Sequence, residues 1–312
     1  MRIAVVGAGA MGSAYGGRLA EAGHEVWLVD VWREHVDALN ERGLRVEGVG
    51  GERAIRVKAT TDPADVGVVD LVMIAVKSWA TESAARSAAP LLGPSTMVLT
   101  VQNGLGNVPL IAAAVGAERV VGGIALESGA IRGPGHLAHT SSNQTQIADL
   151  AGGRTPRVER LAETFNAAGI RTVVGENLDT VIWGKLLLNV TNNALTAVTG
   201  LCIGELPEYE GTAFLMERII LEAAAVAAAL GVRLPYPDPV ARVRENCREV
   251  GMAKSSMLQD LEHGRRTEID FMNGAIVREG EKVGVPTPYN LTMTQLVKAL
   301  EQSGVRRGKP LR

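Results

Sequence analysis

The order of apolar and polar positions divides the chain into two parts. In the first part, short continuous apolar runs alternate with polar and helical stretches, and they predict strands at residues 3–6, 25–29, 68–76 and 97–101. Such runs are typical of strands that a parallel sheet buries on both faces. An apolar-periodic stretch at 11–22 predicts a helix between the first two strands. The first part is therefore expected to be a Rossmann-type parallel sheet.

The pattern changes between residues 119 and 174. Shorter alternating segments, such as HLAHT and TQIADL, are separated by Gly and Pro, and a helical segment at 156–168 precedes an apolar run at 170–174. Alternation of this kind predicts an antiparallel or mixed edge that extends the sheet. His136 and His139 lie here at strand spacing, and we expect them to be surface side chains rather than ligands.

After Gly175 every strong period is helical. The predicted helices are 178–199, 211–230, 240–250, 255–263, 268–283 and 290–302. Thr267 and Asp270 have the spacing of a capping box that would open the fifth of these helices. The fold class is therefore α/β: a dinucleotide-binding Rossmann domain at 1–176 with an antiparallel extension, and an all-helical substrate and catalytic domain at 177–312.

Composition and charge narrow the class of protein. The 312 residues are 46% hydrophobic, enough for two cores, and the net charge of −2 favours neither nucleic acid nor an anionic membrane surface. Cys202 and Cys247 form no Cys/His cluster, so we expect thiols in a reducing compartment and neither a disulfide nor a metal site. No secretory signal or membrane span is visible, which favours the cytoplasm.

The first strand runs directly into the sequence GAGAMG. The motif comprises Gly7, Ala8, Gly9, Ala10, Met11 and Gly12. In the G-x-G-x-x-G motif of a Rossmann fold, the first glycine permits a tight turn, the second lets a pyrophosphate approach, and the third allows close helix packing. Asp30 follows the second strand, where a carboxylate can bond an adenosine ribose. This context predicts a dinucleotide site.

Two further strands end in polar residues. Lys77 follows the run at 68–76, and Asn103 follows the run at 97–101. Ligands of parallel sheets bind at the carboxyl ends of the strands, so both residues are candidates for the place where cofactor and substrate meet. Either could equally be an ordinary surface residue of a loop.

The segment WGKLLLNVTNNALTA has a polar stripe on an otherwise apolar helix. In a helix, Asn189 lies about 40° from Lys185, Asn193 about 80°, and Asn192 about 20° to the other side. An ammonium and three amides on one face can bind a polar molecule and offer it a proton. Alternatively, the amides bond neighbouring backbone and the lysine extends to water.

These motifs together resemble the ketopantoate reductase (2-dehydropantoate 2-reductase) family. The resemblance covers essentially the whole chain, and its most specific part is SSMLQDLEHGRRTEIDFMNG at 255–274. The family reduces the ketone of 2-dehydropantoate with NADPH to (R)-pantoate, on the way to pantothenate and coenzyme A. The resemblance thus implies a cytoplasmic oxidoreductase with a small 2-oxo acid as substrate.

The resemblance also implies roles for individual residues. Lys185 would be the proton donor, and Glu268 would lie near both Lys185 and the nicotinamide, although a carboxylate in the first turn of a helix also reads as a capping charge. Asn189, Asn193 and Ser256 would bind the substrate, while Lys77, Asn103 and Ser128 would line the cofactor. Ile203 departs from the family, many of whose members have a further substrate-binding Asn there.

Two alternatives follow from these observations. Relatives in the same superfamily are D-2-hydroxyacid dehydrogenases, so an NAD-dependent enzyme acting on another branched 2-oxo acid is the second candidate. A cofactor sensor without chemistry is the third, although it would be expected to lose Lys185 and Glu268. The Ala-rich stretch 223–230 is either core or interface. The family includes dimers as well as monomers, and we expect a homodimer.

The cofactor itself is either NADPH or NADH. NADPH users of the family usually have a basic residue after the second strand, whereas this chain has Asp30. A carboxylate there accepts ribose hydroxyls and repels a 2′-phosphate, which favours NADH. Arg33 would reverse that preference if it reached the ribose while Asp30 turned away.

Overall fold

The computed structural model describes residues 1–304, which form two compact units. One consists of Met1–Gln102 and Asn107–Val181, and the other of Asn103–Gly106 and the chain from Ile182 onward. The division on the main chain thus falls within a helix, and the short segment Asn103–Gly106 is grouped with the second unit. The sequence-based domain boundary at 176/177 stays a prediction.

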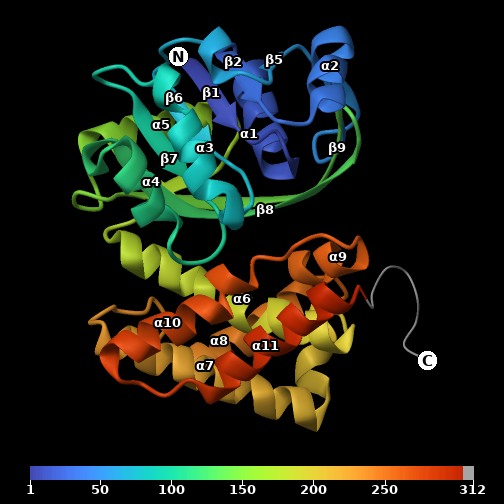
Figure 1. The fold of residues 1–312 in the computed structure, drawn as a ribbon, viewed down its shortest axis with the longest axis vertical. Coiled ribbons are helices and arrows are strands. Elements are labelled where there is room, and N and C mark those ends of the chain that lie inside the picture. Colours follow the sequence, from blue (N-terminus) through green and yellow to red (C-terminus); the bar gives the residue numbers. More distant parts are fainter. Residues whose placement is uncertain (305–312) are drawn as a thin grey trace. The chain divides into compact units, whose positions relative to one another are not determined.

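The first unit is built on one ten-stranded sheet (Figure 1). Its strands are β1 (Arg2–Val6), β2 (Glu25–Val29), β3 (Leu44–Gly48), β4 (Arg53–Ile55), β5 (Lys58–Thr60), β6 (Leu71–Ile74), β7 (Met97–Thr100), β8 (Val120–Gly133), β9 (His136–Asp149) and β10 (Thr172–Val174). The order is β4-β3-β9-β8-β7-β6-β1-β2-β5, with β10 beside β9. Pairing is parallel from β8 to β5, as the continuous apolar runs predicted.

Five helices accompany this sheet. They are α1 (Ala10–Glu21), α2 (Arg33–Arg42), α3 (Thr81–Ser87), α4 (Asn107–Val115) and α5 (Pro156–Ala167). Side chains of α1 such as Tyr15 and Leu19 share a core with β1, β2 and the long strands, and Phe165 of α5 joins the same core. The α/β class of the first unit is therefore confirmed.

The region after residue 119 differs in detail from the prediction. The alternating segments are parts of two long antiparallel strands, β8 and β9, whose pairing continues through three register shifts. They do not form the edge, because β3 pairs with β9 in parallel and extends the sheet further.

His139 is a correction to the expected surface location. It is 1% exposed, and its Nε2 lies 2.7 Å from Oε2 of Glu127, which also accepts a hydrogen bond from the Ser142 hydroxyl. Arg18 of α1 is 3.9 Å from the same carboxylate. His139 thus belongs to a buried polar cluster on β8 and β9. His136 is partly exposed and pairs with Glu47 at 3.1 Å.

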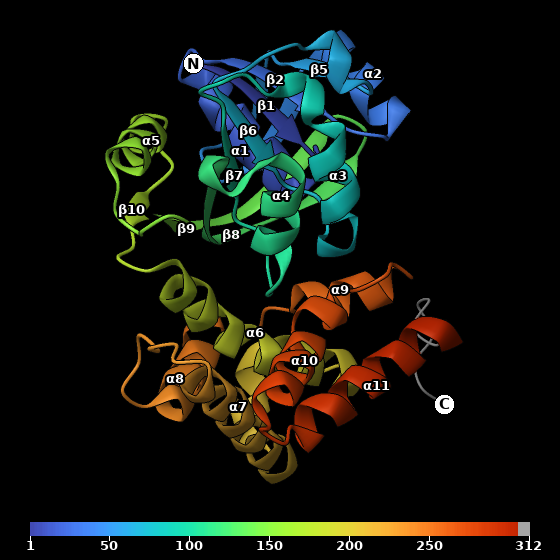
Figure 2. The same cartoon turned by 60° about the vertical axis from the view of Figure 1, so that its left-hand side comes forward.

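The second unit is helical. Its helices are α6 (Leu178–Thr199), α7 (Glu210–Ala229), α8 (Pro239–Val250), α9 (Ser256–Glu262), α10 (Asn273–Val283) and α11 (Pro288–Ser303), with 3₁₀ turns at Ile203–Glu208 and Ile269–Phe271. The core joins α6, around Trp183 and Leu187, to α7, α8, α10 and α11, which Figure 2 shows around it. No helix within residues 1–304 is long and apolar enough to cross a membrane.

The predicted capping box at Thr267 is wrong. The Thr267 hydroxyl accepts the Ile269 N–H at 3.2 Å, but a 3₁₀ turn follows and the helix begins only at Asn273. The Asp270 carboxylate instead forms an ion pair with Lys298 of α11 at 2.5 Å. Asp270 therefore pairs with another helix and does not cap its own.

Candidate functional site

The glycine-rich loop has the geometry that the motif predicts. Gly7 has a φ of 101°, and a Cβ there would lie 2.8 Å from the backbone of Ala75. A Cβ on Gly12 would lie within 1.9 Å of the Gly7 carbonyl oxygen, so loop and helix require glycine at both points. Gly9 is exposed, with open space around its Cα, and it precedes α1. An anion can therefore reach the unsatisfied first-turn N–H groups of α1.

Asp30 is bonded directly to this loop. Its carboxylate accepts the Ala8 N–H at 2.7 Å through Oδ2 and the Trp32 N–H at 3.0 Å through Oδ1. Two backbone donors on different segments hold the carboxylate at the end of β2, which opposes its rotation away from the loop. Arg33 begins α2, is exposed, and makes no ion pair within the described residues.

The side chain of Gln102, which follows β7, is bonded to the segment that follows β6. The amide nitrogen of Gln102 donates to the Val76 carbonyl at 2.6 Å and to the Thr81 hydroxyl at 2.8 Å. Lys77 follows Val76 and precedes a 3₁₀ turn at Ser78–Ala80, where it is partly exposed. Gln102 therefore fixes the loop that contains Lys77.

Asn103 and Ser128 are the other two residues expected at the cofactor. Asn103 is grouped with the helical unit, where the next residues pack on Phe271: the Leu105 N–H donates to the Phe271 carbonyl at 2.7 Å. Ser128 is exposed on β8, beyond the segment that pairs with β7. Its role at a cofactor stays a prediction.

In the helical unit, Lys185 and Glu268 form an electrostatic pair. Lys185 lies on α6, and Glu268 precedes the 3₁₀ turn at Ile269–Phe271 and is 6% exposed. Burial lowers the pKa of Lys185 from 10.5 to about 8, and the negative charge of Glu268 opposes that change. The ammonium is therefore a much stronger acid than a lysine in water, yet it is still mostly protonated at pH 7.

Asn189 lies one turn further along α6. Its amide nitrogen is buried and has no hydrogen-bond partner in the described part of the protein. A buried amide without a partner costs about 1–3 kcal/mol. Such a donor, on the same helix face as Lys185, is a candidate for binding a ligand.

Asn193 and Ser256 are bonded to each other. The Asn193 side-chain oxygen accepts the Ser256 hydroxyl at 3.1 Å and the Met257 N–H at 3.3 Å. Asn193 is 5% exposed, whereas Ser256 is exposed at the start of α9. Asn193 and Ser256, both candidates from the sequence, are therefore brought together by the fold.

The remaining stripe residue, Asn192, is satisfied internally. Its amide nitrogen donates to Asn246 at 2.9 Å, and its oxygen accepts the Cys247 thiol at 3.3 Å. Ile203 is 9% exposed and packs in the core of the helical unit. Its side chain thus has an apolar packing role at the position where a polar ligand was expected from the family.

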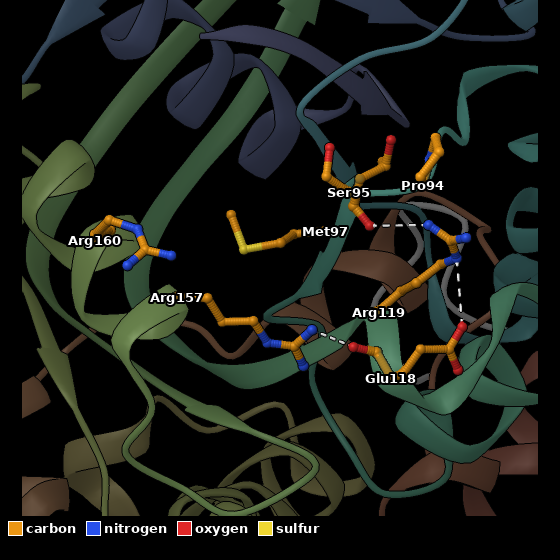
Figure 3. A pocket seen from close by; sticks show the side chains of 8 residues that line it. Pro94, Ser95, Met97, Glu118, Arg119, Arg157 and Arg160 are labelled. Carbon is orange, nitrogen blue, oxygen red and sulfur yellow. Dashed lines mark hydrogen bonds and ion pairs between the residues drawn. The ribbon is translucent and has the colours of Figure 1, made fainter.

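The cavity in Figure 3 is lined by none of the candidate site residues. It holds about 290 Å³ at the amino end of β7 and is lined by Ser95, Met97, Arg119, Arg157 and Arg160, among others. In a parallel sheet this is the edge opposite the glycine-rich loop. Arg157 is paired with Asp149 at 2.6 Å, and Arg119 binds the Gly93 carbonyl at 2.5 Å. These guanidinium groups join structural segments.

Sequence reasoning did not find one residue that holds the loop and one buried histidine. Ser13 donates to the Ala8 carbonyl at 2.8 Å, and His35 of α2 is 1% exposed and accepts the Gly135 N–H at 3.0 Å. In the sequence, His35 stands among polar residues and no spacing marks it as buried. Among the described residues, no group of three or more His, Cys, Asp or Glu side chains could hold a metal ion.

The first unit has a glycine-rich strand–loop–helix and an acidic residue placed to bind a ribose. The helical unit contains a lysine with a lowered pKa. Together these features define the class of nicotinamide-dependent oxidoreductases. Comparison with known proteins specifies the family. The family model for ketopantoate reductase PanE/ApbA matches residues 3–152, and the model for its C-terminal part matches residues 177–301. The chain belongs to the ketopantoate reductase PanE/ApbA family.

Individual relatives and solved structures agree with this assignment. A 2-dehydropantoate 2-reductase of Halobacterium salinarum is 36% identical over 97% of this chain and 100% of its own length, and one of Pyrococcus horikoshii is 34% identical over 97% and 99%. A ketopantoate reductase structure from Ralstonia eutropha has a TM-score of 0.90 at 38% identity, covering 98% of this chain and 100% of that one. D-mandelate dehydrogenase with NADH and anilino(oxo)acetate has a TM-score of 0.91 at 32% identity, with the same coverage.

Proposed function

We propose that this protein reduces the ketone of 2-dehydropantoate to (R)-pantoate with NADH or NADPH. The observation that supports this most strongly is the face of α6, where an acidified Lys185 and an unpartnered Asn189 amide occur together. Curated relatives at 30–36% identity are 2-dehydropantoate 2-reductases over nearly the whole chain.

The residues of the first unit fit a dinucleotide. Open space at Gly9, the first turn of α1 and the fixed Asp30 carboxylate suit a pyrophosphate and an adenosine ribose. We propose that Gly7–Gly12, Asp30 and Lys77 bind the cofactor, with Asn103, Ser128 and Glu268 lining it. When bound, the nicotinamide supplies the hydride.

Lys185 supplies the proton. When hydride adds to the ketone carbon, the carbonyl oxygen develops negative charge, and the ammonium Nζ stabilises it and transfers a proton to it. Lowering the pKa to about 8 makes that transfer easier than from an ordinary lysine. The negative charge of Glu268 favours the protonated form of Lys185, so the lysine still carries its proton at neutral pH.

The amides and the serine orient the substrate. The Asn189 amide donates to the 2-oxo acid, which satisfies the donor that the protein leaves without a partner. The exposed Ser256 hydroxyl binds the carboxylate, and Asn193 positions both Ser256 and the start of α9. These donors are fixed on helices and need little reorganisation.

A second candidate is a D-2-hydroxyacid dehydrogenase acting on another branched 2-oxo acid. It is favoured by the similarity to D-mandelate dehydrogenase with NADH and by the apolar Ile203. Initial rates on 2-dehydropantoate, 2-oxoisovalerate and benzoylformate decide between the two. We expect the highest kcat/KM on 2-dehydropantoate, and an equal or higher value on either other acid would overturn the proposal.

Asp30 favours NADH over NADPH. Two like charges about 4 Å apart cost about 1 kcal/mol in water and about 4 kcal/mol at an effective dielectric of 20, which corresponds to a discrimination of about fivefold up to nearly a thousandfold. The two backbone hydrogen bonds to Asp30 support this, because they oppose the rotation that Arg33 would require. We also propose a homodimer and a cytoplasmic location, the latter consistent with the free thiols of Cys202 and Cys247.

A further inference from the structure

Two hydroxyl groups connect the start of α9 to α6. Ser255 is the N-cap of α9, and its Oγ accepts the Leu258 N–H at 3.1 Å. The same Oγ lies 2.6 Å from Oγ1 of Thr196 on α6. Thr196 is fully buried and Ser255 is 4% exposed, so each hydroxyl depends on the other rather than on bulk water.

The direction of these hydrogen bonds follows from the number of protons. A hydroxyl group has one proton to donate and two lone pairs that accept. Thr196 Oγ1 lies 2.7 Å from the carbonyl of Asn192 and 3.2 Å from that of Asn193, and a carbonyl can only accept. Thr196 therefore donates to the α6 backbone, and Ser255 donates to Thr196. The bonds form one directed chain from the first turn of α9 to the backbone of α6.

Ser256 is the residue that directly follows this N-cap. Its hydroxyl donates to Asn193 Oδ1 at 3.1 Å, and the same oxygen accepts the Met257 N–H at 3.3 Å. When the Ser256 hydroxyl turns to a ligand, the Met257 N–H still satisfies Asn193. Ser256 can thus donate to a carboxylate without leaving a buried acceptor unpaired.

Thr196 lies on the same face of α6 as Lys185. It follows Lys185 by about three turns, and about 20° separate the two residues around the helix axis. Because one helix carries both residues, the bond from Thr196 to Ser255 fixes the start of α9 relative to the lysine. The position of the Ser256 hydroxyl relative to Lys185 is fixed with it.

We propose that Thr196 is a positioning residue for the substrate: through Ser255 it holds the first turn of α9, so that the Ser256 hydroxyl meets the carboxylate of the 2-oxo acid. The inference deepens the proposed function and rests on it. Thr196 acts through Ser255, because its proton and one of its lone pairs are used within the protein.

The segment before α9 has further anchors. The Ile203 N–H donates to the Ala253 carbonyl at 3.0 Å. The Gly204 N–H donates to the Gly251 carbonyl at 2.7 Å. These backbone bonds hold the approach to α9, so loss of the Thr196 hydroxyl should shift the start of α9 without unfolding the helical unit.

Replacing Thr196 by valine keeps the shape of the side chain and removes its hydroxyl. We expect KM for 2-dehydropantoate to rise about fivefold to tenfold, with kcat and KM for NADH within about twofold of the unsubstituted protein. Thr196→Ser retains the hydroxyl and should restore KM. Thr191→Val is the matched control, since Thr191 is equally buried on α6 and, within the described residues, its hydroxyl bonds only the Leu187 carbonyl, at 3.2 Å.

A second comparison tests whether Thr196 acts through Ser256. In a Ser256→Ala background the carboxylate has lost its hydroxyl partner, so adding Thr196→Val should raise KM by less than about twofold. A full further increase there would overturn the proposal. An unchanged KM in Thr196→Val alone, an equal increase in Thr191→Val, or no recovery in Thr196→Ser would also overturn it.

Ser255→Ala covers the case in which Thr196→Val does not fold. It breaks the same chain at its other end and should raise KM for the 2-oxo acid by a similar factor, and an unchanged KM would overturn the proposal.

Amide hydrogen exchange tests the chain of bonds without substrate. Exchange of the Leu258 amide should be at least about fivefold faster in Thr196→Val than in Thr191→Val, and equal rates would overturn the proposal. If the unsubstituted protein reduced none of the three 2-oxo acids, the proposed function would fail, whereas the exchange rates would still decide whether Thr196 holds the start of α9.

Discussion

Replacing Lys185 by methionine should make the helical unit more stable and the enzyme much slower. Burial lowers the pKa of Lys185 from 10.5 to about 8, so the protein holds an ammonium at a cost to its folding free energy. That difference corresponds to about 3 kcal/mol at pH 7. Methionine has a similar length and no charge, and the variant should therefore gain up to about 3 kcal/mol in unfolding free energy.

The expected gain in unfolding free energy depends on pH. Because the pKa is lower in the folded state, the folded protein binds fewer protons than the unfolded chain between pH 8 and 10.5. The stability of the unsubstituted protein therefore rises with pH across that window, and the penalty is complete below pH 8. The advantage of Lys185→Met should be full at pH 7 and approach zero above pH 10.5.

Urea unfolding followed by circular dichroism measures this difference. Lys282→Met is the matched control, since Lys282 is exposed on α10 and pairs with Glu279, and it should change stability by less than about 1 kcal/mol. Loss of the proton donor should lower kcat at least about 10²-fold while NADH still binds. A variant that is less stable at pH 7, or that turns over normally, would refute the reasoning.

Four further predictions concern activity and assembly. The rate of ketone reduction at saturating substrates should fall as pH rises through about 8, because only the ammonium form of Lys185 donates a proton, and a flat profile from pH 7 to 10 would contradict this. Asn189→Leu should raise KM for the 2-oxo acid about tenfold or more with little loss of stability, as judged by kinetics and thermal unfolding; an unchanged KM would count against the role of its amide. NADH should be used at least as well as NADPH, and Asp30→Ala should reduce that preference; a kcat/KM for NADPH more than tenfold above that for NADH would refute it. Light scattering should show a dimer, and a monomer of about 33 kDa at micromolar concentration would exclude one.

The sequence predicted the elements whose apolar pattern is complete. The helix expected at 178–199 and the strand at 25–29 have the same ends in the structure, because both are buried along most of their length. The strands β3, β4 and β5 were missed, since each is short and contains charged residues. The polar middle of β9 was read as a break, although cross-strand pairing with β8 continues through it.

For the candidate site, the residue types were predictable but their partners were not. The glycine-rich loop follows from local backbone requirements, which a short motif contains in full. The bond between Asn193 and Ser256 joins residues 63 positions apart, and the hydrogen bond from Ala8 to Asp30 spans 22. Such contacts depend on how the elements pack, and no periodicity along the chain specifies them.

On the polar face of α6, the hydrogen bonds that a side chain makes distinguish a candidate functional residue from a structural one better than its position on the helix does. Asn192 and Asn193 lie on the same arc as Lys185 and Asn189, yet their oxygens accept protein donors from α8 and α9. Lys185 and Asn189 instead combine an electrostatic penalty with an unpaired buried donor. Packing alone would favour apolar residues at both positions, so we propose that they are retained on a rigid helix for a ligand whose developing negative charge they stabilise together.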